Sequence, residues 1–167
     1  MKKIPVLLFI FSLFFVTESF SDTLVLSSKL KVDYPNPVLI SHTENTLIIK
    51  YENWSFLHNI VNPKEIYHTI DLTGLEKDFI LSIFEQKTNS NFPEWLNALS
   101  REQAKEFGVT SSNVLRRKIN LSEIIGVYDK KRNSGYLYVF DETKIHHFVI
   151  YGSEEKYNLL VSYIKER

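Results

Sequence analysis

The sequence contains no cysteine. Disulfide bonds, thiol nucleophiles and thiolate metal sites are therefore excluded on chemical grounds. Small exported domains often depend on disulfides because their cores are thin. This chain must be stabilised by packing alone, and its aromatic residues, 14% of the total, supply large side chains for a core.

Glycine and proline are scarce, with five of each in 167 residues. No Pro/Gly-rich linker, internal repeat or low-complexity tract divides residues 22–167. A chain of about 146 residues can bury roughly 68–70% of its unfolded surface without further help. We therefore expect residues 22–167 to form a single domain.

An excess of charge of either sign is also missing, since 20 basic residues stand against 20 acidic ones. Nucleic-acid binding needs a basic field, which this balance does not provide. We expect no nucleic-acid partner. No cofactor motif is present either, and we expect no cofactor.

The N-terminus does contain a recognisable signal. Lys2 and Lys3 precede an apolar run over residues 4–16, and Ser19 and Ser21 stand three residues and one residue before a possible cut. This arrangement is typical of a secretory signal peptide over residues 1–21, cleaved between Ser21 and Asp22. The apolar run is shorter than the roughly 20 residues of a membrane span. We expect a periplasmic or secreted bacterial protein; the alternative is an uncleaved anchor.

The first part of the domain has the periodicity of strands. Apolar and polar residues alternate over residues 24–34, which predicts one half-buried strand. Residues 38–40, 46–51 and 54–61 predict three more. These four strands precede any helical pattern.

The pattern then changes to that of helices. Thr73 and Glu76 have capping-box spacing ahead of an apolar helical face. Pro93 suits the first turn of a second helix, and Gly108 suits its end. Ser100 and Gln103 have capping-box spacing too, which leaves open two short helices or one bent helix.

The last third predicts a meander followed by a helix. Residues 117–121 could form a strand that leads into a strand at 124–128, and strands at 136–140 and 145–151 follow. Apolar residues on both faces of these strands predict that both faces are covered. After Ser153, an amphipathic helix is predicted by four apolar residues at positions i, i+3, i+4 and i+7: Tyr157, Leu160, Val161 and Ile164.

Strands, helices, strands and a helix in the order β-β-β-β-α-α-β-β-β-α predict an α+β fold with amphipathic helices packed on an antiparallel sheet. The meander, the Gly152-Ser153-Glu154-Glu155 break and the final helix resemble the end of the PsbP-like α/β sandwich group. The resemblance covers residues 124–164 and implies a fold but no activity.

Residues that could support catalysis or bind a metal do not form a known pattern. His146 and His147 are adjacent on a predicted strand and point to opposite faces, and His58 shares a face with aromatic residues. We expect no metal site. No serine-nucleophile motif occurs. Catalysis is left open, with acid pairs such as Glu52 with Asp71, or Asp141 with Glu142, as the only candidates.

Two basic clusters are candidate partner-binding residues. One contains Arg116 and Arg117, and the other contains Lys130, Lys131 and Arg132 in a hairpin loop. Such clusters can bind an anionic partner. The alternative is a solvated loop and a strand edge protected by charge.

Aromatic residues suggest a second kind of site. Trp54, Trp95 and Tyr138 could line an apolar cleft between helix and sheet. Tyr136, Tyr138 and Phe140 share one face of a strand, which favours core packing or a recognition surface.

Three functions follow in order of preference. The first is binding of another protein, as an inhibitor or immunity-type protein, through the loops at residues 129–135 and 41–45. The second is binding of a small ligand or lipid, and the third is cell-wall hydrolysis. We expect a binding protein rather than an enzyme, while the sequence does not indicate the oligomeric state.

Overall fold

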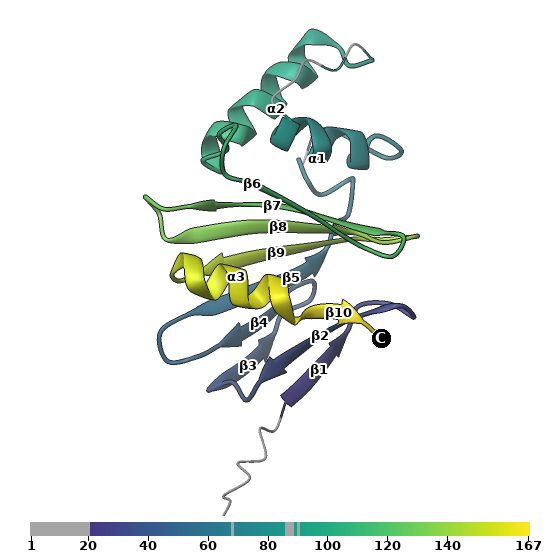
Figure 1. Ribbon diagram of the computed structural model, residues 1–167. Coiled ribbons are helices and arrows are strands. Elements are labelled where there is room, and N and C mark those ends of the chain that lie inside the picture. The colour runs from purple at the N-terminus through teal and green to yellow at the C-terminus, as the bar shows by residue number, and fades with distance from the viewer. Residues whose placement is uncertain (1–20, 68, 86–88, 90) are drawn as a thin grey trace, which may run out of the picture.

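The computed structural model describes residues 21–67, 69–85, 89 and 91–167. The predicted signal peptide lies outside this range except for Ser21. Within it, seven strands form an antiparallel sheet in the order β3-β4-β5-β9-β8-β7-β6, and three strands form a second sheet, β1-β2-β10 (Figure 1). Three helices complete the α+β fold that the sequence predicts.

The elements have the following bounds: β1 Ser21–Val25, β2 Leu30–Pro35, β3 Leu39–His42, β4 Leu47–Lys50, β5 Ser55–Ile60, α1 Glu76–Glu85, α2 Glu94–Glu106, β6 Val114–Ile119, β7 Ser122–Asp129, β8 Ser134–Phe140, β9 Ile145–Tyr151, α3 Glu154–Tyr163 and β10 Ile164–Glu166. None of the helices formed by the described residues is long and apolar enough to cross a membrane.

The single strand predicted at residues 24–34 is two strands. The backbone turns at residues 26–30, where the N–H groups of Leu26 and Ser27 donate to Leu30 O, and β1 pairs with β2 in antiparallel register. The alternation of apolar residues continues through the turn, which is why the sequence pattern did not show the break. In β2 the predicted alternation is present, with Leu30, Val32 and Tyr34 buried.

The predicted break at Ser100 does not occur, because α2 is continuous from Glu94 to Glu106. Ser100 is buried, and its hydroxyl oxygen lies 2.8 Å from that of Ser82 in α1. A capping-box spacing can therefore occur inside a helix when a neighbouring helix supplies the hydroxyl's partner. Gly108 ends this region with a φ of 68°, as its position predicts.

The C-terminal helix is shorter than predicted. It ends at Tyr163, and Ile164 begins β10, which pairs with β2. Ile164 is nonetheless fully buried in the core. Its spacing from the apolar residues of the helix therefore predicted its burial correctly but not its secondary structure. The predicted three-stranded meander has a fourth strand, β6, which is the strand considered at residues 117–121 but begins earlier, at Val114.

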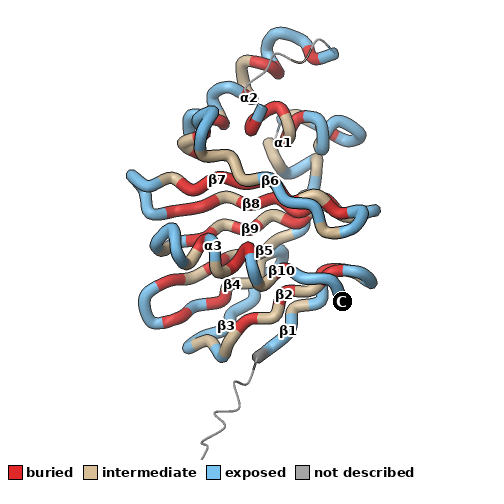
Figure 2. The backbone as a smooth tube through the Cα atoms, viewed as in Figure 1, coloured by how far each residue is buried: buried red, intermediate tan, exposed pale blue. Residues whose placement is uncertain are grey.

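The seven-stranded sheet has a different cover on each face. One face, which we call the α3 face, packs against α3 and the three-stranded sheet. The other, which we call the α1–α2 face, packs against α1 and α2. Figure 2 shows the buried segments concentrated in the central strands β7, β8 and β9.

Two glycines allow α3 to lie close to the sheet. A Cβ atom on Gly135 would overlap the ring of Tyr157, and one on Gly126 would lie 2.6 Å from Tyr136 O. The ring of Tyr157 is thus in direct contact with the backbones of β7 and β8. Any larger residue at these positions must displace the helix.

Candidate functional site

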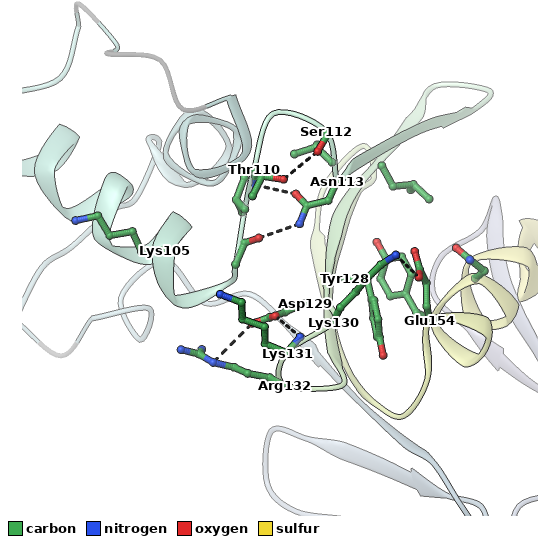
Figure 3. A pocket seen from close by; sticks show the side chains of 16 residues that line it. Lys105, Thr110, Ser112, Asn113, Tyr128, Asp129, Lys130, Lys131, Arg132 and Glu154 are labelled. Atoms are coloured by element: carbon green, nitrogen blue, oxygen red, sulfur yellow. Dashed lines mark hydrogen bonds and ion pairs between the residues drawn. The ribbon is translucent and has the colours of Figure 1, made fainter.

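The basic loop with Lys130, Lys131 and Arg132 forms the turn between β7 and β8. It lines a groove of about 890 Å³, whose other walls are the segment after α2 and the start of α3. Figure 3 shows Lys105 and Thr110 from one side of the groove and Glu154 from the other. The groove is open to solvent, and both polar and apolar groups line it, Tyr128 among them.

Two of the three basic side chains in this loop form ion pairs with nearby carboxylates, and one of them also donates to a backbone carbonyl. Lys130 Nζ lies 3.0 Å from Glu154 Oε2, and Arg132 Nε lies 3.6 Å from Asp129 Oδ2. Arg132 also donates to the backbone carbonyl of Glu106. Within the part of the chain that the structure describes, Lys131 is the one side chain of the three without a carboxylate at ion-pair distance. The loop is therefore a weak attractor for an anionic partner.

Arg116 and Arg117 do not join this groove. Both lie in β6, where Arg116 pairs with Ile125 in the middle of β7, away from the β7–β8 turn. Arg116 contacts Glu85 Oε1 at 2.8 Å and Glu123 Oε1 at 3.3 Å. Arg117 points to the opposite face and donates to Val161 O at 3.0 Å. The two basic clusters are separate, and their charged groups other than Lys131 have partners within the fold.

The three aromatic residues proposed to line a cleft are not brought together. Trp54 is buried on the α3 face, stacked on Tyr51 with ring centroids 4.3 Å apart. Tyr138 is buried on the α1–α2 face, and Trp95 is 54% exposed on α2. The sheet lies between Trp54 and Tyr138, so no cleft contains all three. The predicted sharing of one face by Tyr136, Tyr138 and Phe140 is confirmed, and α1 and α2 cover that face.

For the strands at residues 124–128, 136–140 and 145–151 the sequence predicts that both faces are covered. This is confirmed for β7 and β8, but one face of β9 is only partly covered. The α1–α2 face is covered over β7 and β8, but its half over β3, β4, β5 and β9 retains exposed apolar side chains. Ile48, Leu57 and Val149 are cross-strand neighbours there and are half-buried. Leu39 and Tyr151 stand at the two ends of the next row, with Lys50 and Ser55 between them, and are 52% and 51% exposed. We call these five residues the open-face patch.

The open-face patch reaches an exposed edge. β3 is the last strand of the sheet, and each of its four residues is exposed (Figure 2). Val38, just before it, is 68% exposed. Sequence reasoning missed this site because an apolar strand pattern does not tell which strand is outermost or where the covering helices end.

The histidines form contacts of two kinds. Nε2 of His58 lies 3.1 Å from Nδ1 of His146 on the α3 face, so one ring donates and the other accepts. His147 points to the other face, as predicted, and stacks on Tyr138 with ring centroids 4.4 Å apart. Burial, with His146 and His147 nearby, lowers the pKa of His58 to about 3, and burial lowers the pKa of His147 to about 4. These rings are neutral at pH 7.

The arrangement gives little support to catalysis or to a metal centre. Asp71 accepts hydrogen bonds from the N–H and hydroxyl of Thr73, and Asp141 accepts one from Ser122, so both act in turns. Glu142 forms an ion pair with Lys29. Across the described residues, no three His, Asp or Glu side chains are grouped so that they could hold a metal ion.

No protein-family model, curated protein or solved structure matches this chain. The resemblance to the PsbP-like group therefore stays a prediction. Function has to be inferred from the surfaces described above.

Proposed function

We propose that this chain is an exported, periplasmic protein that acts by binding another protein, as an inhibitor or immunity-type protein. The observation that carries the proposal is the edge strand β3 beside the open-face patch. An edge strand has N–H and C=O groups directed away from its sheet, ready to pair with a strand of another chain. The partner we propose therefore presents an extended segment with apolar side chains.

The composition of β3 supports this choice. Natural edge strands are usually protected by lysine, proline or a bulge. β3 has the sequence Leu-Ile-Ser-His, and Leu39 and Ile40 are 52% and 48% exposed. A protein that had only to remain monomeric would gain from a charge at either position.

The patch beside β3 supplies a second contact area on the same side. Leu39 belongs to both: it lies on β3, and its strand neighbour Ser41 is the cross-strand partner of Ile48. A segment paired with β3 would extend the sheet beyond Leu39, while Tyr151 lies three strands away on β9. Exposed apolar side chains of this kind mark interaction sites on soluble proteins. The loop predicted at residues 41–45 overlaps the β3–β4 turn and borders this region, whereas Lys130 and Arg132 of the loop at residues 129–135 have ion-pair partners.

Site-specific crosslinking tests the proposal. A photoreactive phenylalanine analogue in place of Leu39 should form a crosslink with one other periplasmic protein in living cells. The same analogue at Leu121, which is 78% exposed in the β6–β7 turn, is the matched control and should form none. A crosslink from position 39 only to a second copy of this chain, or equal products from both positions, would contradict the proposal.

Charge substitutions give an independent measurement. Leu39→Lys with Ile40→Lys should abolish recovery of the crosslinked partner by affinity purification, because lysine on an edge blocks strand addition. Leu121→Lys, and Lys130→Glu with Lys131→Glu, should leave recovery unchanged. Loss with the Lys130 and Lys131 variant alone would move the contact to the groove at the β7–β8 turn.

A further inference from the structure

A cavity of about 360 Å³ lies between the sheet and the helices on the α1–α2 face. Strands β5, β8 and β9 form its floor, while α1, α2 and the segment before α1 form its walls. Phe79, Ile83 and Phe107 contribute apolar surface. The volume falls within the range of roughly 300–1,000 Å³ that is usual for small-molecule sites.

One polar atom on the floor of this cavity has no hydrogen-bond partner. Nε2 of His147 is buried and unpartnered, although buried polar side-chain atoms are nearly always paired. The ring is held in place by its stacking on Tyr138, and both residues line the cavity. An unpaired buried nitrogen costs free energy that a ligand atom could recover.

Four of the other polar side chains that line the cavity are hydrogen-bonded to one another in pairs, Asn62 with Glu65 and Tyr67 with Gln103. Tyr67 donates its hydroxyl hydrogen to Gln103 Oε1 at 2.9 Å. Among the described residues that line the cavity, Glu65 is the one with a formal charge, and none is a lysine or arginine. A carboxylate or phosphate ligand would find no cation here and would be opposed by Glu65.

We propose that this cavity binds an uncharged, mainly apolar organic molecule whose one polar group hydrogen-bonds to Nε2 of His147. Apolar walls with a small number of polar groups are the usual composition of such sites, and here the polar groups include the amides of Asn45, Asn59 and Gln103. The neutral imidazole donates or accepts at Nε2, depending on its tautomer. This site differs from the proposed protein contact, because α1 and α2 form most of its wall, although Asn45 and Thr46 of the β3–β4 turn also line it.

Binding of the neutral dye Nile red tests the proposal. Its fluorescence should rise with saturation at one dye per chain, whereas the anionic dye anilinonaphthalene sulfonate should show no saturable binding. Absence of saturable Nile red binding, which would indicate a cavity filled by water, would overturn the proposal. Stronger binding of the anionic dye would overturn the assigned ligand class.

Two matched variants locate the dye. Asn59 is the cross-strand neighbour of His147 and lines the cavity, so Asn59→Trp should fill it and weaken binding at least tenfold. Ser55→Trp places the same ring on the same strand and face, outside the cavity and next to Tyr151. It should leave the dissociation constant unchanged; the reverse result would place the dye on the open-face patch and overturn the proposal. Circular dichroism verifies folding of both variants.

The role of His147 has its own readout. His147→Phe keeps a ring against Tyr138 but removes Nε2. We expect the dissociation constant to rise two- to tenfold, the effect of about one hydrogen bond. His42→Phe changes an exposed histidine outside this cavity and should have no effect. An unchanged dissociation constant in His147→Phe would overturn the assignment of Nε2 as the ligand's polar contact.

Discussion

The two faces of the seven-stranded sheet differ in how completely they are covered. On the α3 face the central side chains Phe56, Phe148 and Ile150 have no exposed surface. On the other face their chain neighbours Leu57 and Val149 remain half-buried. Alternate residues of the same strands thus lie in two different environments.

Within this one sheet, the α3 face contributes mainly to stability, and the α1–α2 face contains the proposed binding surfaces. The α3 face is closed by a helix and a second sheet, and it contains the larger single core. The α1–α2 face has its helices over one half only, which leaves the cavity beneath them and the open-face patch beside them. A cavity or an uncovered apolar patch would weaken the α3 face. On the α1–α2 face the same two features are the proposed binding surfaces.

Truncation of neighbouring residues in β5 should reveal this difference most clearly. Phe56→Ala on the α3 face should lower the free energy of unfolding by about 3–5 kcal/mol, because it removes a fully buried ring and leaves a cavity. Leu57→Ala on the other face should cost about 1 kcal/mol, because its side chain is partly in water already. Urea denaturation measures both. Equal losses would show that the open-face patch is covered in solution.

The close approach of Tyr157 to the sheet gives the next largest effect. Gly135→Ala should cost about 3 kcal/mol, since the new methyl group overlaps the Tyr157 ring and α3 must move. Gly74→Ala is the control: it has open space around the position but a φ of 80°, so it should cost about 1 kcal/mol from backbone strain alone. Thermal denaturation that ranks Gly74→Ala as the more damaging change would contradict the packing of α3 described here.

Much of the fold could be predicted from the sequence, because alternation and helical spacing report burial locally. The strands at residues 136–140 and 145–151 and the helix after Ser153 were predicted within a few residues. The failures have local causes as well. The turn at residues 26–30 continues the alternation of its strands. The strand considered at residues 117–121 is β6 at Val114–Ile119, an edge strand whose charged residues Arg116, Arg117 and Lys118 lie in its middle and not at its start.

The candidate sites could not be predicted in the same way, because they depend on long-range register. The pairing of β5 with β9 joins residues about 90 positions apart and decides that Asn59 lies beside His147. It also places Trp54 and Tyr138 on opposite sides of the sheet. Burial can be read from spacing, but which helix covers which half of a face depends on packing between distant segments.

The loss of stability at acidic pH should report how strongly each face excludes water from its buried histidine. His58 on the α3 face and His147 on the other have pKa values of about 3 and about 4 in the folded chain, below the ordinary 6.5. The unfolded chain therefore binds more protons below pH 6.5, and stability should fall as the pH drops from 6.5 towards 4. We expect a loss of about 1–2 kcal/mol per histidine between pH 7 and pH 5.

Variants assign that acid sensitivity to its sources. His147→Phe and His58→Phe should each reduce the pH dependence of the unfolding free energy between pH 7 and pH 5 by a similar amount, because both folded-state pKa values lie below this range. The exposed His42, changed to Phe, should leave it unaltered. A slope that is the same in all three variants would show that neither buried ring is responsible.

The smallest difference concerns the two arginines of β6, which point to opposite faces. Arg117 donates to Val161 O in the last turn of α3, a charged hydrogen bond at the negative end of the helix, and Arg117→Ala should cost about 1–2 kcal/mol. Arg116 has ion pairs with Glu85 and Glu123 near the surface, where such pairs contribute about 0–1 kcal/mol. The loss of unfolding free energy in Arg116→Ala should lie near the lower limit of that range. High salt should remove most of the Arg116 effect and little of the Arg117 effect. If Arg116→Ala proved the more damaging, α1 and not α3 would be the helix that β6 anchors.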